Sequence, residues 1–491
     1  MKQIIKVIAL ISIACSCTSR SYDPESMRPN ILLVITDDQS WEHAGCYGDD
    51  AVRTPATDLI ATEGIRFDNA YTACPSCSPS RASVLSGQDS YRLEEGGVLT
   101  GFLRDKFALF PKLLEENGYF VGSTGKRYWP RTQNVEGAVD EPIGIVFEKH
   151  RLESAPEGIS KNNYSANFDD FLDQAPGDKP FFFWVGIGEP HLKYQTNRGV
   201  EIGIDTSKIR VPAFLPDVPV TRLEMADYMS EIEWADDAIG GMIESLKSRG
   251  LKDNTLIIIT SDNGMPFPRS KATLYDHGVR MPLVISWSNW IKGNRIITDP
   301  VSLIDIAPTV LDLAGIMTPE QMTGRSIKNL LFSEKSGHID KDREFVVTTF
   351  EKHTLCRPDS MGFPRRAIHT GDWTYIVNYE PDRYPNGNVD LYIPMWDVLG
   401  DTDPSRIKTY FKENMTKTEF NTLWELSFGK VPREQLFNKK NDPDMINNLA
   451  NNPGFKAIKE ELREKLEKYL IETDDPRSRG ESPWDNYNLD K

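Results

Sequence analysis

The chain has 491 residues and a formal net charge of −16 at neutral pH. This length exceeds one ordinary hydrophobic core, so we expect two domains. Hydrophobic residues make up 39% of the chain and charged residues 26%, which is typical of a globular protein rather than a disordered or membrane-embedded one. The acidic balance argues against nucleic-acid binding, and a polyanionic substrate would need a local basic pocket.

The first 17 residues have the pattern of a bacterial export signal. Lys2 and Lys6 place positive charge near the terminus, and the apolar run 7–14 is too short to span a bilayer. The sequence Ala14-Cys15-Ser16-Cys17 indicates lipoprotein processing, but Ser12 stands where a lipobox usually has leucine. We therefore expect an exported protein, either periplasmic or an outer-membrane lipoprotein whose lipid anchor would use Cys15 or Cys17.

After this segment, predicted strands alternate with predicted helices. Continuous apolar runs predict strands that are buried on both faces at residues 31–36, 181–187, 256–260 and 282–287. A further strand is predicted at residues 119–123. Helices are predicted over 107–117, 223–248 and 304–314. A methionine-containing stripe on the second helix indicates core packing rather than a cofactor site. The order of elements favours an α/β domain with a large, mostly parallel sheet flanked by helices, over residues 25–370.

The pattern changes beyond the polar stretch 333–343. Short antiparallel strands are predicted at residues 366–369, 373–377 and 434–437, and a final amphipathic helix carries Phe455, Ile458, Leu462, Leu466 and Tyr469. We expect a smaller C-terminal α+β domain with a short antiparallel sheet over residues 371–491. Its polar end, residues 474–491, is predicted to be a poorly packed tail.

Two pairs of oxygen-bearing side chains directly follow predicted strands. Asp37 and Asp38 come after the strand at 31–36, and Asp262 and Asn263 come after the strand at 256–260. Ligands bind at the carboxyl ends of strands in open α/β sheets. Three carboxylates and an amide suit Ca²⁺ or Mg²⁺ better than zinc. Either pair alone is more often a helix cap or a turn, but both pairs together favour a metal site.

The run Cys77-Ser78-Pro79-Ser80-Arg81 places a nucleophile-type side chain just before a predicted helix start. The free N–H groups and the dipole at a helix N-terminus favour an anion there. Cys74 also completes a C-x-x-C pattern, which is an alternative. Zinc would need a second ligand pair, which the sequence lacks, and a thioredoxin-like redox role leaves Pro79 to Arg81 unexplained.

Three further side chains follow strands that are predicted to end at the same edge. His191 follows the strand at 181–187, Lys126 follows the strand at 119–123, and Lys271 follows the turn at Asp262. Each has an ordinary alternative, a loop histidine or a solvated lysine. At this edge the histidine would serve as a general acid, and the lysines would stabilise an anion.

The run from Cys77 to Arg81 resembles the signature of the type I sulfatases, in which this cysteine is oxidised to formylglycine. Residues 28–38 resemble the opening strand and the calcium-binding pair of that family. The resemblance extends to residues 260–264, 271–282, 442–443 and 448–450. Within the family, residues 76–83 and 261–268 are similar to those of the heparan N-sulfatases (N-sulfoglucosamine sulfohydrolases). In that subgroup arginine stands in place of Lys271, and Asp-Pro-His in place of Glu189-Pro190-His191.

This resemblance implies an alkaline-phosphatase-like sandwich in which residues 25–370 form the catalytic domain. It implies one Ca²⁺ held by Asp37, Asp38, Cys77 (as formylglycine), Asp262 and Asn263. It further implies that Arg81 orients the formylglycine hydrate and that Lys126 and Lys271 hold sulfate oxygens. In the same resemblance, His191 protonates the leaving group and Glu189 binds substrate. The expected partners are a sulfated glycan and a formylglycine-generating, sulfatase-maturing enzyme; no nucleic-acid partner is expected.

The expected substrate is a sulfated glucosamine at the non-reducing end of heparan sulfate or heparin, with an N-sulfate preferred to an O-sulfate. The alternatives are a glycan O-sulfatase, a phosphonate or phosphodiester hydrolase of the same superfamily, and an inactive glycan-binding lipoprotein. One departure matters: the family usually has Gly-Lys-x-His, but here Tyr128 replaces the histidine that acts as a base on the hydrate. Tyrosine, with a reference pKa of roughly 10, is a poor base near neutrality. His353, Arg365 and Arg366 are further candidates for the pocket from the domain junction; the equally weighted alternative for each is an ordinary surface or interface residue.

Overall fold

The computed structural model describes residues 28–128 and 135–485. The predicted export segment, with Cys15 and Cys17, lies outside these residues. Within them, no helix is both long enough and apolar enough to cross a membrane.

A large sheet brings together strands that are far apart in the sequence, in the order β5-β4-β6-β1-β7-β8-β2-β9. The central strand β1 pairs in parallel with β6 and β7, and β4 pairs in parallel with β6 and β5. Only β8 runs antiparallel to its neighbours β7 and β2. The prediction of a mostly parallel sheet is therefore confirmed. The strands are β1 (Asn30–Thr36), β2 (Ile65–Phe67), β4 (Phe120–Gly125), β5 (Ile145–Val146), β6 (Phe181–Gly186), β7 (Thr255–Ser261), β8 (Leu283–Ser286) and β9 (Arg295–Ile297).

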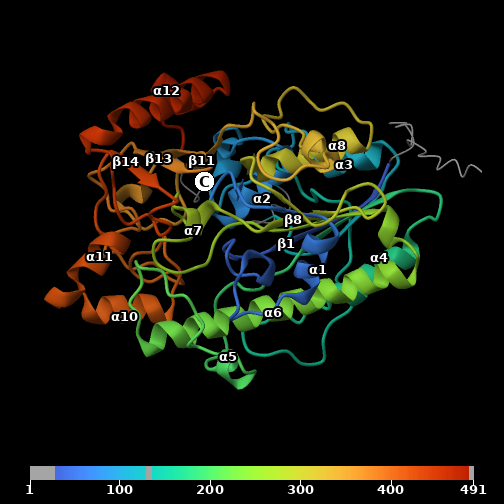
Figure 1. The fold of residues 1–491 in the computed structure, drawn as a ribbon, viewed down its shortest axis with the longest axis horizontal. Helices are drawn as coiled ribbons and strands as arrows, with labels where there is room; N and C mark the ends of the chain where they lie inside the picture. Colours follow the sequence, from blue (N-terminus) through green and yellow to red (C-terminus); the bar gives the residue numbers. More distant parts are fainter. Residues whose placement is uncertain (1–27, 129–134, 486–491) are drawn as a thin grey trace, which may run out of the picture.

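Helices cover both faces of this sheet (Figure 1). Ile31, Leu33 and Ile35 of β1 pack into a core with the helices on one face, whereas Leu32 and Val34 pack with the helices on the other. This two-sided burial explains why the strands are continuous apolar runs rather than alternating ones. The first face carries α2 (Cys77–Ser86), α3 (Phe110–Glu116) and α8 (Ile306–Leu313); the second carries α1 (Pro55–Glu63), α4 (Tyr164–Gln174) and α6 (Pro219–Ser248).

The long helix α6 begins four residues earlier than predicted, at Pro219, because proline is well suited to the first helical position. The predicted core stripe is confirmed, since Met225, Met229 and Met242 are buried. Several further elements are short. Strand β3 (Ala70–Tyr71) pairs with β10 (Val301–Ser302). The helices among them are α5 (Arg198–Glu201), α7 (Asp276–Val279), α9 (Lys328–Phe332), α10 (Arg406–Asn414) and α11 (Asn421–Phe428).

A second, antiparallel sheet lies toward the C-terminal end, in orange and red in Figure 1. It joins β11 (Val346–Phe350), β12 (Arg365–His369), β13 (Trp373–Asn378) and β14 (Glu434–Asn438) in that order. The helix α12 (Lys456–Glu472) packs on it through Leu462 and Leu466. Strand β11 was not predicted, and a domain boundary at residue 371 falls between β12 and β13.

The prediction of a poorly packed tail is wrong for residues 474–485. The buried Arg366 forms ion pairs with Asp475 at 2.8 Å and with Glu351 at 2.7 Å. Trp484 is buried and donates its indole N–H to the carbonyl oxygen of Glu94. Buried charge pairing and an aromatic anchor hold this polar segment in place, which its composition alone does not indicate.

Candidate active site

The two predicted oxygen-bearing pairs meet at one edge of the large sheet. Thr36 is paired with Ser261 at the ends of β1 and β7, so the next residues of both strands leave the sheet side by side. Asn263 donates its side-chain N–H to Asp38 Oδ1 at 2.7 Å, and the backbone N–H of Asp38 donates to Asp262 Oδ1 at 3.2 Å. All four side chains of these pairs are buried.

In the turn after β1, Asp38 adopts a left-handed backbone conformation with φ of 72°. This conformation costs a residue other than glycine about 1–2 kcal/mol, so it persists only where the surroundings hold it. The backbone N–H of Asp37 donates to the carbonyl of Glu189, and that of Asp262 donates to the carbonyl of Thr36. These bonds hold the backbone at the start of both turns.

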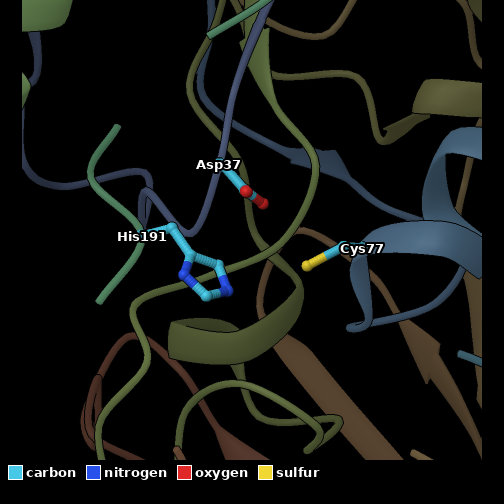
Figure 2. Close-up of side chains that lie close together, drawn as sticks. All are labelled: Asp37, Cys77 and His191. Carbon is cyan, nitrogen blue, oxygen red and sulfur yellow. The ribbon is translucent and has the colours of Figure 1, made fainter. Parts of the chain in front are cut away.

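Cys77 is itself the first residue of α2, rather than just before the helix as predicted, and Ser76 is the N-cap. Its Sγ lies 3.8 Å from Asp38 Oδ1. The side chains of Cys77, Asp37 and His191 point toward one another (Figure 2). The N-terminus of α2 therefore directs residue 77 at the carboxylate cluster.

The chemistry of the two cysteines does not support the redox alternative. Burial, with the charge of Asp37, raises the pKa of the Cys77 thiol well above its usual value, and burial raises that of Cys74 to about 12. Redox-active C-x-x-C pairs have lowered thiol pKa values instead. Both cysteines are free thiols.

The three predicted cationic side chains are interleaved with the carboxylates. Arg81, one turn along α2, donates from Nε to Asp262 Oδ2 and from Nη1 to the carbonyl of Lys126, each at 2.8 Å. Lys126 Nζ lies 2.5 Å from Asp37 Oδ2, and Lys271 Nζ lies 2.9 Å from Asp38 Oδ2. The structure therefore places positive charge against both Asp37 and Asp38.

His191 has one fixed and one available nitrogen. Its Nδ1 forms a hydrogen bond with the carbonyl oxygen of Leu192 at 2.7 Å, while Nε2 lies 3.8 Å from Asp38 Oδ2. The His191 side chain is 35% exposed and that of Lys126 is 26% exposed, whereas the other predicted site residues are buried. A ligand would therefore enter beside these two side chains.

The predicted substrate contact of Glu189 does not match its position. Its carboxylate accepts hydrogen bonds from the backbone N–H of Ser160 at 2.7 Å and from the hydroxyl of Tyr164 at 3.1 Å. The side chain is buried, and its backbone carbonyl holds Asp37. Glu189 is thus a support for the turn after β1 and does not face the cluster.

The candidates at the domain junction divide into two groups. His353 reaches the site, because its Nδ1 is 2.8 Å from the hydroxyl of Ser76, next to Cys77; burial and the charge of Lys271 lower its pKa to about 4. Arg365 donates to the carbonyl of Ala272, next to Lys271. Arg366 does not reach the site, since it pairs with Glu351 and Asp475.

Sequence reasoning missed Asp403, which precedes α10. Its Oδ2 lies 2.8 Å from Lys271 Nζ, and one carboxylate oxygen lies within 4.8 Å of ligand atoms of both Asp38 and His191. No sequence signal distinguishes it, because an Asp-Pro dipeptide is typical of turns. Tyr128, by contrast, donates its hydroxyl to the carbonyl of Gly101 at 2.6 Å and packs against the core.

The cluster fits a hard divalent cation. Ligand atoms of Asp37, Asp38, Cys77 and Asp262 lie within 4.8 Å of one another. Among the described residues, the buried Asp37 Oδ1 and Asn263 Oδ1 have no hydrogen-bond partner. Burial and the charge of Asp37 raise the pKa of Asp262 to about 7, which reflects the crowding of like charges. A cation would relieve this repulsion, and oxygen donors suit Ca²⁺ or Mg²⁺.

Comparison with known families agrees with this geometry. The model described as "Sulfatase" matches residues 29–316. The chain belongs to the sulfatase family. A second model, described as "N-sulphoglucosamine sulphohydrolase, C-terminal", matches residues 269–425. The predicted family is therefore confirmed, and this sulfatase is a hydrolase of sulfate esters or sulfamates.

Individual relatives span most of the sulfatase. Human N-sulphoglucosamine sulphohydrolase is 28% identical over 488 residues, covering 91% of each chain. The N-acetylglucosamine-6-O-sulfatase of Bacteroides thetaiotaomicron is 26% identical over 535 residues, covering 89% of this chain and 91% of that one. A solved enzyme in complex with its substrate D-glucosamine-2-N,6-O-disulfate superposes with a TM-score of 0.67 at 20% identity, covering 93% of this chain and 100% of that chain. This last likeness supports the predicted alkaline-phosphatase-like fold.

Proposed function

We propose that this sulfatase removes the N-sulfate from a non-reducing-end glucosamine of heparan sulfate or heparin. The observation that carries the proposal is the match of residues 269–425 to the C-terminal model of N-sulphoglucosamine sulphohydrolases. This segment contains Asp403, which lies near His191, and Lys271, which pairs with Asp403 and Asp38. The 28% identity with the human enzyme over 91% of both chains is further support.

Residue 77 would act as formylglycine, produced from Cys77 by a maturing enzyme. A buried thiol with a raised pKa is a poor nucleophile, so the unmodified side chain is unsuited to attack on sulfur. Asp37, Asp38, Asp262 and Asn263 would hold one Ca²⁺ beside it. When both groups are present, the ion supplies Lewis-acid polarisation and the hydrated aldehyde supplies an oxygen nucleophile.

The surrounding side chains hold the sulfate and move the proton. Lys126 and Lys271 approach the cluster from different loops and would bind the sulfate oxygens through charge-assisted hydrogen bonds. The guanidinium of Arg81 bridges Asp262 and the backbone of Lys126, so it keeps residue 77 and the cation ligands in register. His191 Nε2 would donate a proton to the departing nitrogen, since Nδ1 is occupied by Leu192.

Burial determines which end of a substrate enters. Only His191 and Lys126 among these residues are substantially exposed, so a sulfate group would reach the buried cluster beside these two side chains. The leaving sugar would then remain on the His191 side. A terminal sulfated residue fits this one-sided access, which favours action at a chain end.

Sulfate release from defined disaccharides tests the proposal. We expect faster release from an N-sulfated glucosamine terminus than from its 6-O-sulfated counterpart. Release only from O-sulfated sugars would refute the sulfamidase assignment and favour a glycan O-sulfatase. The 26% identity with the 6-O-sulfatase of B. thetaiotaomicron supports this second candidate. Faster turnover of aryl phosphate than of aryl sulfate would instead indicate the phosphoester or phosphonate hydrolase.

Mass spectrometry of the peptide that contains Cys77 tests the maturation. Conversion to formylglycine lowers the mass by roughly 18 Da relative to cysteine. An unmodified peptide after native expression, together with no sulfate release, would favour the inactive glycan-binding alternative. We also propose export to the periplasm or outer membrane, on the basis of the N-terminal sequence; palmitate labelling, compared between the natural chain and a variant with Cys15 and Cys17 replaced by serine, tests the lipid anchor.

A further inference from the structure

Asp403 has one occupied and one available carboxylate oxygen. Its side chain is buried, and Oδ2 accepts a hydrogen bond from Lys271 Nζ at 2.8 Å. Oδ1 is also buried and has no hydrogen-bond partner among the described residues. The carboxylate belongs to a group with Asp38 and His191 in which the ligand atoms lie within 4.8 Å of one another. The unpaired acceptor Oδ1 therefore belongs to a carboxylate that lies close to the predicted general acid.

The loop that carries Asp403 is held firmly. Lys408 Nζ donates to three carbonyl oxygens of this loop, those of Trp396 at 3.0 Å, Leu399 at 3.1 Å and Thr402 at 2.6 Å. On the other side, Asp401 accepts from the backbone N–H of Thr354 at 2.8 Å and from the guanidinium of Arg357 at 2.7 Å. Such support from neighbouring bonds is what a recognition residue needs to keep its position.

The carboxylate of Asp403 is an acceptor only. Its Oδ2 lies 2.8 Å from the ammonium of Lys271 in a buried ion pair, and this pairing favours the ionised carboxylate. An ionised carboxylate accepts hydrogen bonds and donates none. A ligand atom placed against Oδ1 must therefore carry a hydrogen, or the buried charge remains unpaired at a substantial cost.

We propose that Asp403 is the residue that distinguishes sulfamates from sulfate esters, by accepting a hydrogen bond from the N–H of the scissile group. The bridging nitrogen of a sulfamate carries one hydrogen, whereas the bridging oxygen of an ester carries only lone pairs that a carboxylate repels. This inference rests on the proposed function and deepens it. A site built to pair with a substrate N–H discriminates against analogues that lack it.

The same contact is maintained through bond cleavage. When the S–N bond breaks, its electron pair goes to nitrogen, sulfur is taken by the attacking oxygen at residue 77, and His191 Nε2 gives its proton to nitrogen. The nitrogen leaves as a primary amine. Its original hydrogen stays on nitrogen and remains hydrogen-bonded to Asp403 Oδ1. His191 thus meets the lone pair of the nitrogen and Asp403 meets its hydrogen, which orients the leaving group.

The variant Asp403→Asn tests this role, because the amide keeps the shape but replaces one acceptor oxygen by a donor. We expect kcat/KM for N-sulfated glucosamine to fall by roughly 10- to 100-fold, the size of a hydrogen bond to a charged group. The value for 6-O-sulfated glucosamine should change far less. An equal loss on both substrates, or no loss on either, would overturn the inference and leave Asp403 as a support for Lys271.

Asp401→Asn is the matched control, since Asp401 lies in the same loop but pairs with Arg357 and Thr354. It should lower stability without changing the ratio of the two kcat/KM values. The wild-type protein supplies a second test that needs no variant: an N-methylated sulfamate has no N–H, so its kcat/KM should fall at least 10-fold. Turnover equal to that of the unmethylated sulfamate would contradict the inference.

These outcomes separate the two proposals. Wild-type protein that releases sulfate only from esters refutes the proposed function and this inference together. A different outcome refutes the inference alone: the wild-type protein is active on sulfamates, and Asp403→Asn has the same ratio of kcat/KM for the N-sulfated and 6-O-sulfated substrates as the wild type.

Discussion

Two regions of the molecule contribute to the site in different ways. The strand-end cluster, made of Asp37, Asp38, Cys77, Asp262 and Asn263, is placed by parallel strands and the helix α2 that end at one edge. The C-terminal region, residues 346–485, reaches the same place by contacts between distant segments, such as Lys271 with Asp403. In the proposed mechanism, the first region supplies the reaction chemistry and the second contacts the leaving group. The predictions below test this division.

The largest effect is expected at residue 77. Cys77→Ala removes the thiol that the proposed maturation would replace with an aldehyde oxygen, so sulfate release should fall by roughly 10⁴-fold or more. Cys74→Ala is the matched control in the same C-x-x-C run, and it should retain activity because Cys74 is absent from the cluster. Colorimetric sulfate assays on both proteins check this. Similar losses in the two variants would revive a paired-cysteine role.

A large stability effect is expected in the C-terminal region. Asp475 is fully buried against Arg366, so Asp475→Asn should lower the free energy of unfolding by about 3–5 kcal/mol, as for other broken buried pairs. The neighbouring Asp474 has a side chain that is 72% exposed. Asp474→Asn should therefore change the free energy of unfolding by less than about 0.5 kcal/mol. Urea unfolding of both variants measures the difference. Equal stabilities would mean that the tail is not anchored.

The pH dependence of stability should depend on His277, which lies 3.0 Å from Asp444 and 3.2 Å from Glu42. Burial lowers its pKa, but these two carboxylates raise it overall, to about 9. Because the folded-state pKa exceeds the unfolded value, this stabilisation is complete below about pH 6.5 and is lost as pH rises through 9. At about 1.4 kcal/mol per pKa unit, deprotonation of His277 should lower the free energy of unfolding by about 3 kcal/mol.

Urea unfolding between pH 6 and pH 9.5 checks this prediction. The wild-type protein should lose stability over that range, and His277→Gln should lose much less of it. The same slope in both proteins would assign the pH dependence to other groups.

Ca²⁺ should stabilise the strand-end cluster measurably. At a concentration 100-fold above its Kd, a bound ion adds about 2.7 kcal/mol to the free energy of unfolding. Asp262→Asn should lose most of this increment, because the variant removes a charged donor. Asp236→Asn is the control, since Asp236 instead accepts from the backbone of Ala56 and Thr57 at the start of α1. Thermal unfolding with and without Ca²⁺ compares them; an unchanged increment in Asp262→Asn would exclude this site.

The smallest effect is expected at Tyr128, where the family usually has a histidine. Its hydroxyl donates to Gly101, so Tyr128→Phe should cost about 1 kcal/mol of stability. Sulfate release should remain within about twofold of wild type, because a hydroxyl that serves as a structural donor is not a catalytic base. A loss of 100-fold or more would identify Tyr128 as the missing base.

The sequence predicted the first region well and the second poorly, for a physical reason. The runs at 31–36 and 256–260 are continuous because the sheet is buried on both faces, and the residues after such strands must meet at one edge. Asp403 lies 132 residues from Lys271, in a run that looks like any surface turn. Asp475 lies 109 residues from Arg366, in a polar segment. Contacts of this kind depend on the tertiary fold and leave no local pattern.

Glu189 and strand β11 show the same limit on a smaller scale. Glu189 follows a correctly predicted strand, but its carboxylate turns to Ser160 and Tyr164 rather than to the cluster. Strand β11 is a short run after a polar stretch, and its pairing with β12 defines it. Position along the chain placed Glu189 at the right edge of the sheet but not the direction of its side chain, and it gave no sign of β11.

The most direct test of the account is an anomalous-diffraction map of the matured protein crystallised with Ca²⁺. We predict one strong calcium peak about 2.3–2.6 Å from oxygens of Asp37, Asp38, Asp262 and Asn263, in contact with residue 77. A map with no peak there, or with calcium held by only one of the two acidic turns, would contradict the central claim that both turns form a single cation centre beside residue 77.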